Sequence, residues 1–321
     1  MYQKKEFCAG QLLVLILCML LIMLSFTGCG DSQGVPESQD QSQEEAQESE
    51  SFVPYAAPEF NGSSFNGEAS YTDGQAYIDI SSLSKGYVGA SATSEKRLKF
   101  QVIKGETTYN YDLSSDGTPS IFPIQSGDGV YTFRVMENIE GTKYACMYSI
   151  DGEAVLENEF QPFLRPSDYV NYNTGSDCVI KAQELASKEE DALGVVSAIF
   201  DYICKKVKYD HPKAENIQSG YLPDPDETLK TGKGICIDYA ALAAAMMRSQ
   251  GIPVKMVFGY VSPNDIYHAW NMFYTEETGW VTVKYEVTGN TWNRMDVTFS
   301  ANGADSSFIG NGENYADVYY Y

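Results

Sequence analysis

The sequence predicts an α+β protein in which a β-sandwich-like domain precedes a domain with a helix packed on an antiparallel sheet. Two observations predict this order. Residues 71–164 form short β-rich runs about ten residues apart, separated by turn residues, which is typical of a sandwich. From residue 179 onward, apolar residues recur at helical spacing, and β-rich runs then follow. The 321 residues are enough for two domains with cores of their own.

The composition excludes several classes of function. The chain has 44 acidic and 22 basic residues, and the resulting charge of −22 repels phosphate backbones, so we expect no nucleic-acid partner. Seven cysteines without CxxC pairs or histidine clusters do not indicate a zinc site, and we expect no metal and no cofactor. The chain has two histidines, His211 and His268, so a mechanism that needs a histidine has two candidates.

The first residues have the order of a secretory signal. Lys4 and Lys5 precede an apolar run over residues 12–24, which is shorter than the roughly 20 residues of a permanent span. The run is followed by Phe-Thr-Gly-Cys, which resembles a bacterial lipoprotein signal. We therefore expect residues 1–28 to be removed, Cys29 to be lipidated, and the protein to be anchored at the outer face of the cytoplasmic membrane. A signal anchor and an ordinary signal peptide are the alternatives.

The rest of the chain divides into a tether and two domains. Residues 29–55 are rich in acidic residues and poor in apolar ones, which predicts a disordered tether. Residues 56–170 form the β-sandwich-like domain, and residues 171–321 form the second domain. The strands expected in the sandwich span residues 76–80, 87–90, 98–103, 107–113, 130–135 and 143–150. This domain shows no paired carboxylates, so we interpret it as a spacer, with binding or positioning as the alternatives.

The second domain begins with helices. Residues 191–207 place an apolar stripe on one helix face, and residues 179–186 form a shorter helix before it. Pro212 prevents the helical part from continuing. Residues 213–234 follow as a polar loop, and loops of this length often border a functional site.

Cys236 stands at the start of an alanine-rich helix that extends to residue 248. Unpaired amides and the positive end of the helix dipole favour thiolate over thiol there, and thiolate is the nucleophilic form. The glycines before the cysteine leave room for a substrate to approach. A buried structural cysteine is the alternative.

A sheet follows the cysteine helix. The β-rich runs cover residues 254–261, 268–274 and 280–285, and residues 295–299 come after them. Such a sheet can bring a histidine from one strand and a carboxylate from the next toward the thiolate. The imidazole would accept and return the proton, and the carboxylate would hold its tautomer.

The sequence from GKGICIDYA through HAW to MDVTF resembles the bacterial transglutaminase-like family, a branch of the papain-like cysteine enzymes. The resemblance covers residues 179–299. It implies that Cys236 is the nucleophile, His268 the base and Asp296 the residue that orients the base. In the family the aspartate commonly follows the strand directly, whereas residues 284–294 intervene here.

Because of that insertion, Asp265 and Glu286 are substitutes to consider for Asp296. The backbone amide of Cys236 is one candidate oxyanion donor, and the resemblance suggests Tyr209 as a second. Trp270 and Tyr239 are candidate substrate-binding residues, with packing as the alternative.

Four further residues have no catalytic role in this interpretation. His211 precedes a proline in a polar loop and is expected to be an exposed bystander, while Cys204 is expected in the core. Cys146 and Cys178 could form a disulfide in an exported protein, but their spacing does not decide it.

The resemblance implies an extracytoplasmic acyl-transfer enzyme that acts on peptide or side-chain amides through a thioester. We expect hydrolysis, as in a peptidase or amidase, rather than cross-linking, with a cell-surface protein or a cell-wall peptide as substrate. The alternative is a catalytically inactive surface lipoprotein that binds a protein or the cell wall.

Overall fold

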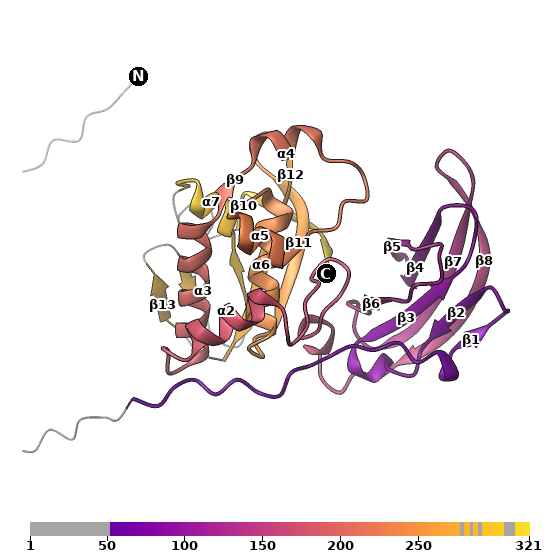
Figure 1. Cartoon of the computed structure of the whole chain (residues 1–321), viewed down its shortest axis with the longest axis horizontal. Coiled ribbons are helices and arrows are strands. Elements are labelled where there is room, and N and C mark those ends of the chain that lie inside the picture. Colours follow the sequence, from indigo (N-terminus) through magenta and orange to yellow (C-terminus); the bar gives the residue numbers. More distant parts are fainter. Residues whose placement is uncertain (1–51, 277–278, 283–284, 288–290, 305–311) are drawn as a thin grey trace, which may run out of the picture. The chain divides into compact units, whose positions relative to one another are not determined.

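Figure 1 shows a computed structural model that describes residues 52–276, 279–282, 285–287, 291–304 and 312–321. The signal peptide, Cys29 and most of the expected tether lie outside the described residues. Tyr55, at the end of that tether, donates a hydrogen bond from its hydroxyl to the carbonyl of Gln250 at 2.9 Å. Within the described ranges, no helix is both long enough and apolar enough to cross a bilayer.

The N-terminal domain is a β-sandwich of two four-stranded antiparallel sheets, as predicted. Phe100 of one sheet stacks on Phe122 of the other, with ring centroids 4.7 Å apart, so the two inner faces share one core. Three short 3-10 helices, η1 (Gly67–Ala69), η2 (Leu83–Lys85) and η3 (Gln161–Phe163), lie beside the strands. In sheet order, the strands are β1 (Tyr71–Thr72), β2 (Ala76–Asp79), β3 (Tyr87–Ala92) and β6 (Ser120–Pro123), then β5 (Thr107–Leu113), β4 (Leu98–Lys104), β7 (Gly129–Glu140) and β8 (Lys143–Ala154).

Helices α2 (Asp177–Ala186), α3 (Ala192–Lys206) and α6 (Cys236–Arg248) form the helical layer of the C-terminal domain. The apolar stripe predicted on α3 is buried, and Asp191 caps the helix by accepting a hydrogen bond from the amide of Gly194. Helix α6 contacts α2 and α3 on one side and strands of the sheet on the other (Figure 1). Its small alanine side chains allow this close packing and leave the helix buried from Asp238 to Arg248.

The sheet beside α6 has the order β15-β12-β11-β16, and every neighbouring pair is antiparallel. The Asn271 side chain of β12 donates to the carbonyl of Ala240, so the sheet and the helix are bonded directly. The strands are β11 (Val254–Val261), β12 (Ile266–Thr275), β15 (Thr291–Met295) and β16 (Tyr315–Tyr320).

The sequence predicts a third strand of this sheet over residues 280–285; a strand does form at residues 279–282, but it belongs to another sheet. Strands β13 (Gly279–Thr282) and β14 (Tyr285–Val287) form a separate two-stranded sheet, and β15 takes the place beside β12. A local β-rich run does not show which of two nearby segments will pair with a distant strand, because pairing depends on tertiary contacts.

The polar loop predicted over residues 213–234 is present only in part, because the segment contains two short helices. These are α4 (His211–Asn216) and α5 (Pro225–Thr231), while β9 (Lys208–Tyr209) pairs in parallel with β10 (Lys233–Gly234). Both helices carry a proline in the first turn, where no amide donor is needed, and an aspartate as N-cap. Pro212 therefore starts a new helix after the chain has left α3.

Candidate active site

Cys236 is the first residue of α6 and is partly exposed. The preceding residue, Ile235, is extended and donates its amide to the Asp238 carboxylate at 2.8 Å, which fixes the start of the helix. A Cβ at position 234 would lie 2.7 Å from the Asp238 Cβ, so glycine is required for this approach. Cys236 thus lies where free amides and the helix dipole favour a negative charge.

His268 of β12 is 4% exposed and connects two side chains. Its Nε2 lies 2.8 Å from Oδ2 of Asp296, and its ring is also hydrogen-bonded to the side chain of Cys236. Because Nε2 is used by Asp296, Nδ1 is the nitrogen that faces the thiol. The Phe299 ring stacks on the imidazole, with centroids 4.3 Å apart and an angle of 11° between the planes.

The surroundings of His268 favour the imidazolium. Burial lowers the pKa of His268, but the hydrogen bonds to Asp296 and Cys236 and the negative charges of both outweigh burial and raise the pKa to about 9. The ring is therefore protonated at neutral pH, and its positive charge lies beside the sulfur of Cys236.

Asp296 directly follows β15 and is the N-cap of α7 (Val297–Ala301). Its Oδ1 accepts from the amide of Phe299 at 2.9 Å, and its Oδ2 accepts from the Tyr315 hydroxyl at 3.0 Å as well as from His268. Burial and the charge of Asp296 raise the pKa of Tyr315, so its phenol stays a donor. The carboxylate is therefore fixed by donors from three different elements.

The two substitutes considered for Asp296 are not in this position. Asp265 is exposed and has a φ of 48° in the turn between β11 and β12. The side chain of Glu286 lies outside the described residues.

Cys236 and His268 line a cleft of about 480 Å³. Residues 214 and 217–221 form one wall, and Tyr169, Phe258 and Tyr267 contribute aromatic rings elsewhere in the lining. The predicted oxyanion donor Tyr209 also lines the cleft. Burial raises the pKa of Tyr209, and the negative charges of Cys236 and Asp238 raise it further, so its hydroxyl remains protonated. Its role as an oxyanion donor stays a prediction.

The prediction of Trp270 and Tyr239 as substrate-binding residues is wrong. Trp270 is 1% exposed and Tyr239 is 0% exposed, so neither ring is accessible to a substrate. Trp270 packs edge-on against Tyr315 at 4.9 Å, on strands β12 and β16, whereas Tyr239 is part of the core around α6. The prediction failed because a sequence motif does not show whether the side chain of a neighbouring aromatic residue points into the cleft or into the core.

The remaining predicted residues lie outside this cluster. His211 is exposed, with its ring 5.0 Å from that of Tyr209, and Cys204 is buried on α3. Cys146 is exposed and Cys178 is buried, and both are free thiols, so the disulfide considered between them is not present in the structure.

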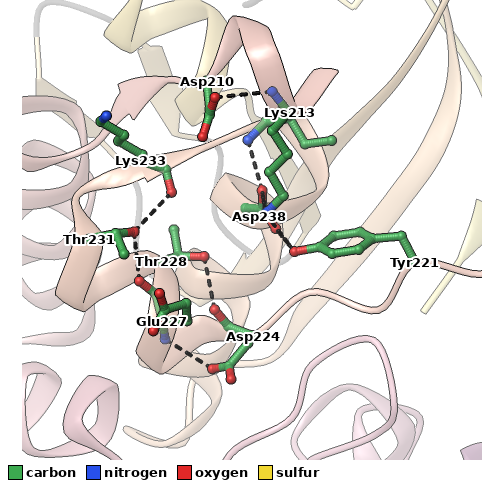
Figure 2. A network of polar contacts seen from close by, with 10 residues as sticks. Asp210, Lys213, Tyr221, Asp224, Glu227, Thr228, Thr231, Lys233 and Asp238 are labelled. Carbon is green, nitrogen blue, oxygen red and sulfur yellow. Dashed lines mark hydrogen bonds and ion pairs between the residues drawn. The ribbon is translucent and has the colours of Figure 1, made fainter. Parts of the chain in front are cut away.

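The sequence interpretation missed a polar cluster beside Cys236. Figure 2 shows Lys213, Tyr221 and Asp238 converging, and we call these three residues the Asp238 cluster. An aspartate at the third position of a helix is a known capping signal and could have indicated Asp238. No local pattern points to Lys213 or Tyr221, because both reach Asp238 from a separate segment of the chain.

Residues 181–285 match the family model described as the transglutaminase-like superfamily. The chain therefore contains a transglutaminase-like domain, as its sequence predicted. The matched range includes Cys236 and His268 and ends before Asp296.

Comparisons with individual proteins give partial matches. The chain is 32% identical over 78 residues to the UPF0252 protein MJ1282 of Methanocaldococcus jannaschii, and it spans 22% of that protein's length. A candidate cysteine protease from Cytophaga hutchinsonii is 17% identical with a TM-score of 0.39, covering 77% of this chain and 78% of that one. LapG of Legionella pneumophila is 15% identical with a TM-score of 0.30, covering 44% and 83%. Red sea bream transglutaminase is 12% identical with a TM-score of 0.31, covering 70% and 48%.

Proposed function

We propose that this protein is an exported, thiol-dependent acyl-transfer enzyme that acts on peptide or side-chain amides. One observation carries the proposal: Cys236 begins a helix and is hydrogen-bonded to His268, whose other nitrogen is bonded to Asp296. A nucleophile, a base and a group that orients the base are the parts that nucleophilic catalysis requires.

In the proposed reaction, the Cys236 thiolate attacks the amide carbonyl carbon, and the C–N bond breaks as the amine takes the proton from Nδ1 of His268. The enzyme is left as a thioester. Water then gives a proton to the same nitrogen and attacks the thioester, which releases the acid and restores the thiolate. The backbone amide of Cys236 and the hydroxyl of Tyr209 are the proposed donors to the oxyanion.

We propose hydrolysis as the main outcome rather than transfer to an amine. A lysine acceptor approaches as a cation and is attracted by negative charge. The described residues that line the cleft include no aspartate or glutamate, so nothing in this lining would concentrate lysine ammonium groups around Cys236. We therefore expect water, rather than a lysine amine, to react with the thioester.

The site of action follows from the N-terminal segment. The lipoprotein-like signal supports a lipid anchor at Cys29 and a substrate outside the cytoplasm, either a cell-surface protein or a cell-wall peptide. The mass of the N-terminal peptide of the membrane-extracted protein tests this part. A diacylglyceryl group on Cys29 is the expected result, and an unmodified Met1 would contradict it.

The decisive test of the chemistry is alkylation by iodoacetamide as a function of pH, with the labelled cysteines mapped by mass spectrometry. Exposed Cys146 is a reference thiol in the same molecule. We expect Cys236 to react faster than Cys146 at about pH 6.5, and to lose this advantage in His268→Ala. A Cys236 that follows Cys146 at every pH would favour the alternative of a surface binding lipoprotein.

A further inference from the structure

The cleft wall next to Cys236 is held by the Asp238 cluster. Asp238 lies two residues beyond Cys236, is fully buried, and uses both carboxylate oxygens. Oδ2 accepts from the Ile235 amide at 2.8 Å and from Lys213 Nζ at 2.7 Å, and Oδ1 accepts from the Tyr221 hydroxyl at 2.6 Å. Lys213 Nζ also donates to the Tyr221 oxygen at 2.6 Å (Figure 2), so each member of the cluster contacts the other two.

The cluster connects two parts of the site that are distant in sequence. Asp238 belongs to the nucleophile helix, whereas Lys213 lies in α4 and Tyr221 follows it. Most residues between Lys213 and Tyr221 line the cleft that contains Cys236. The cluster therefore fixes this segment at both ends relative to the helix that carries the thiol.

Little apolar burial holds this segment in place. Residues 215–220 are all exposed, and α4 has no buried residue. Segments with few buried apolar contacts open locally at low free-energy cost, so their polar contacts decide how far they open. The ion pair of Lys213 and Asp238 is a charge-assisted contact of this kind, and it is partly shielded from water because the two side chains are only 30% and 0% exposed.

We propose that Lys213, Tyr221 and Asp238 are positioning residues, which hold residues 213–221 as a closed wall and so set the access of bulky polypeptide substrates to Cys236. The inference deepens the proposed function, because the wall belongs to the same cleft. It concerns access and is separate from the His268–Asp296 pair, which activates the thiol.

The test compares Lys213→Met with Lys205→Met in the full-length protein. Lys205 is a matched control because it also forms an ion pair, with Asp201 at 3.2 Å, but on the exposed face of α3, where it is 77% exposed. Each variant is labelled at Cys236 with two reagents, iodoacetamide and a bulky fluorescein maleimide. Hydrogen exchange of residues 211–221 is measured in parallel, because it needs no turnover.

We expect Lys213→Met to raise the ratio of the maleimide labelling rate to the iodoacetamide labelling rate about tenfold. Hydrogen exchange in residues 211–221 should become faster by a similar factor, because the variant loses one charge-assisted hydrogen bond that holds the segment in place. The iodoacetamide rate itself stays within about twofold, since His268 and Asp296 are untouched. Lys205→Met should behave as wild type. Tyr221→Phe, which keeps the ring but removes the hydroxyl, gives a smaller change in the same direction, and Lys213→Arg restores part of the wild-type ratio.

An unchanged labelling ratio in a folded Lys213→Met protein overturns the proposal, and so does faster exchange without a changed ratio. With a polypeptide substrate, the positioning role requires KM to fall in Lys213→Met while kcat changes little, because the opened wall admits the substrate more easily, and a change in kcat alone contradicts it. Should the wild-type protein show no turnover, the proposed function fails, but the labelling ratio and the exchange rates still decide the role of the cluster.

Discussion

Replacing Asp296 by asparagine should change the protonation of His268. The carboxylate accepts from His268, the Tyr315 hydroxyl and the amide of Phe299. An asparagine has one acceptor oxygen, so it can keep the Phe299 cap or face His268, but not both. We expect the asparagine oxygen to keep the cap of α7, so that the asparagine NH₂ faces Nε2 of His268. The NH₂ and the protonated Nε2 are both hydrogen-bond donors, so they would repel each other.

The size of the effect follows from the surroundings of the ring. A pKa raised from 6.5 to about 9 corresponds to about 3 kcal/mol of preference for the imidazolium, and the hydrogen bond to Asp296 is the largest contribution that raises it. Without that bond, burial dominates, and we expect the pKa of His268 to fall below about 6.5. At about pH 7.5 the protonated fraction would then drop from roughly 97% to less than roughly 10%.

NMR of histidine-labelled protein measures this directly. The chain has two histidines, so the imidazole signals of His268 are assigned by their persistence in a His211→Gln variant. We expect the wild-type His268 signals to titrate near pH 9 and those of Asp296→Asn to titrate below about pH 6.5. Equal titration of His268 in both proteins would refute the reasoning, because it would mean that Asp296 does not control the ring.

Three further predictions concern the site and its support. Cys236→Ala should abolish turnover and leave the melting temperature nearly unchanged, since the side chain is partly exposed, and a turnover assay with a thermal melt checks both. Gly259→Ala should cost about 2 kcal/mol of unfolding free energy, because a Cβ there would lie 2.1 Å from the carbonyl oxygen of Ala316; Gly67→Ala is the control, with its nearest contact at 3.5 Å. The folded-state pKa of His268, about 9, lies above its unfolded value of 6.5, so the stability that it contributes is fully present below about pH 6.5 and is lost as the pH rises through about 9. Urea denaturation across this range should show that loss in the wild type and not in His268→Gln.

The sequence was most informative where local chemistry decides the structure. The apolar stripe of α3, the alanine-rich α6 with Cys236 at its start, and the pairing of His268 with Asp296 are all present as expected. The first feature depends on helical periodicity and the second on the chemistry of a helix start. The third depends on short sequence motifs that themselves contain His268 and Asp296. The β-sandwich was predictable for a similar reason, because its strands alternate between the two faces of the sheet, as β5 does with buried and exposed residues from Tyr109 to Leu113.

The errors arose where partners come from distant segments. Strand β15 replaced the expected strand over 280–285 because pairing with β12 is settled in three dimensions. The Asp238 cluster was missed because Lys213 lies 25 residues before its partner, and no local rule links them. Trp270 was misjudged because its strand places the ring in the core instead of in the cleft.

The stacking of Phe299 on His268 constrains the order of events in the proposed reaction. The ring is covered on one face by Phe299 and bonded at Nε2 to Asp296, so a rotation that exchanges its two nitrogens would break both contacts. Nδ1 must therefore both deliver the proton to the departing amine and accept the next one from water. The departing amine and the incoming water therefore use the same nitrogen in turn. The amine has to leave before water can reach Nδ1, so an amine product that stays bound beside His268 would inhibit hydrolysis of the thioester.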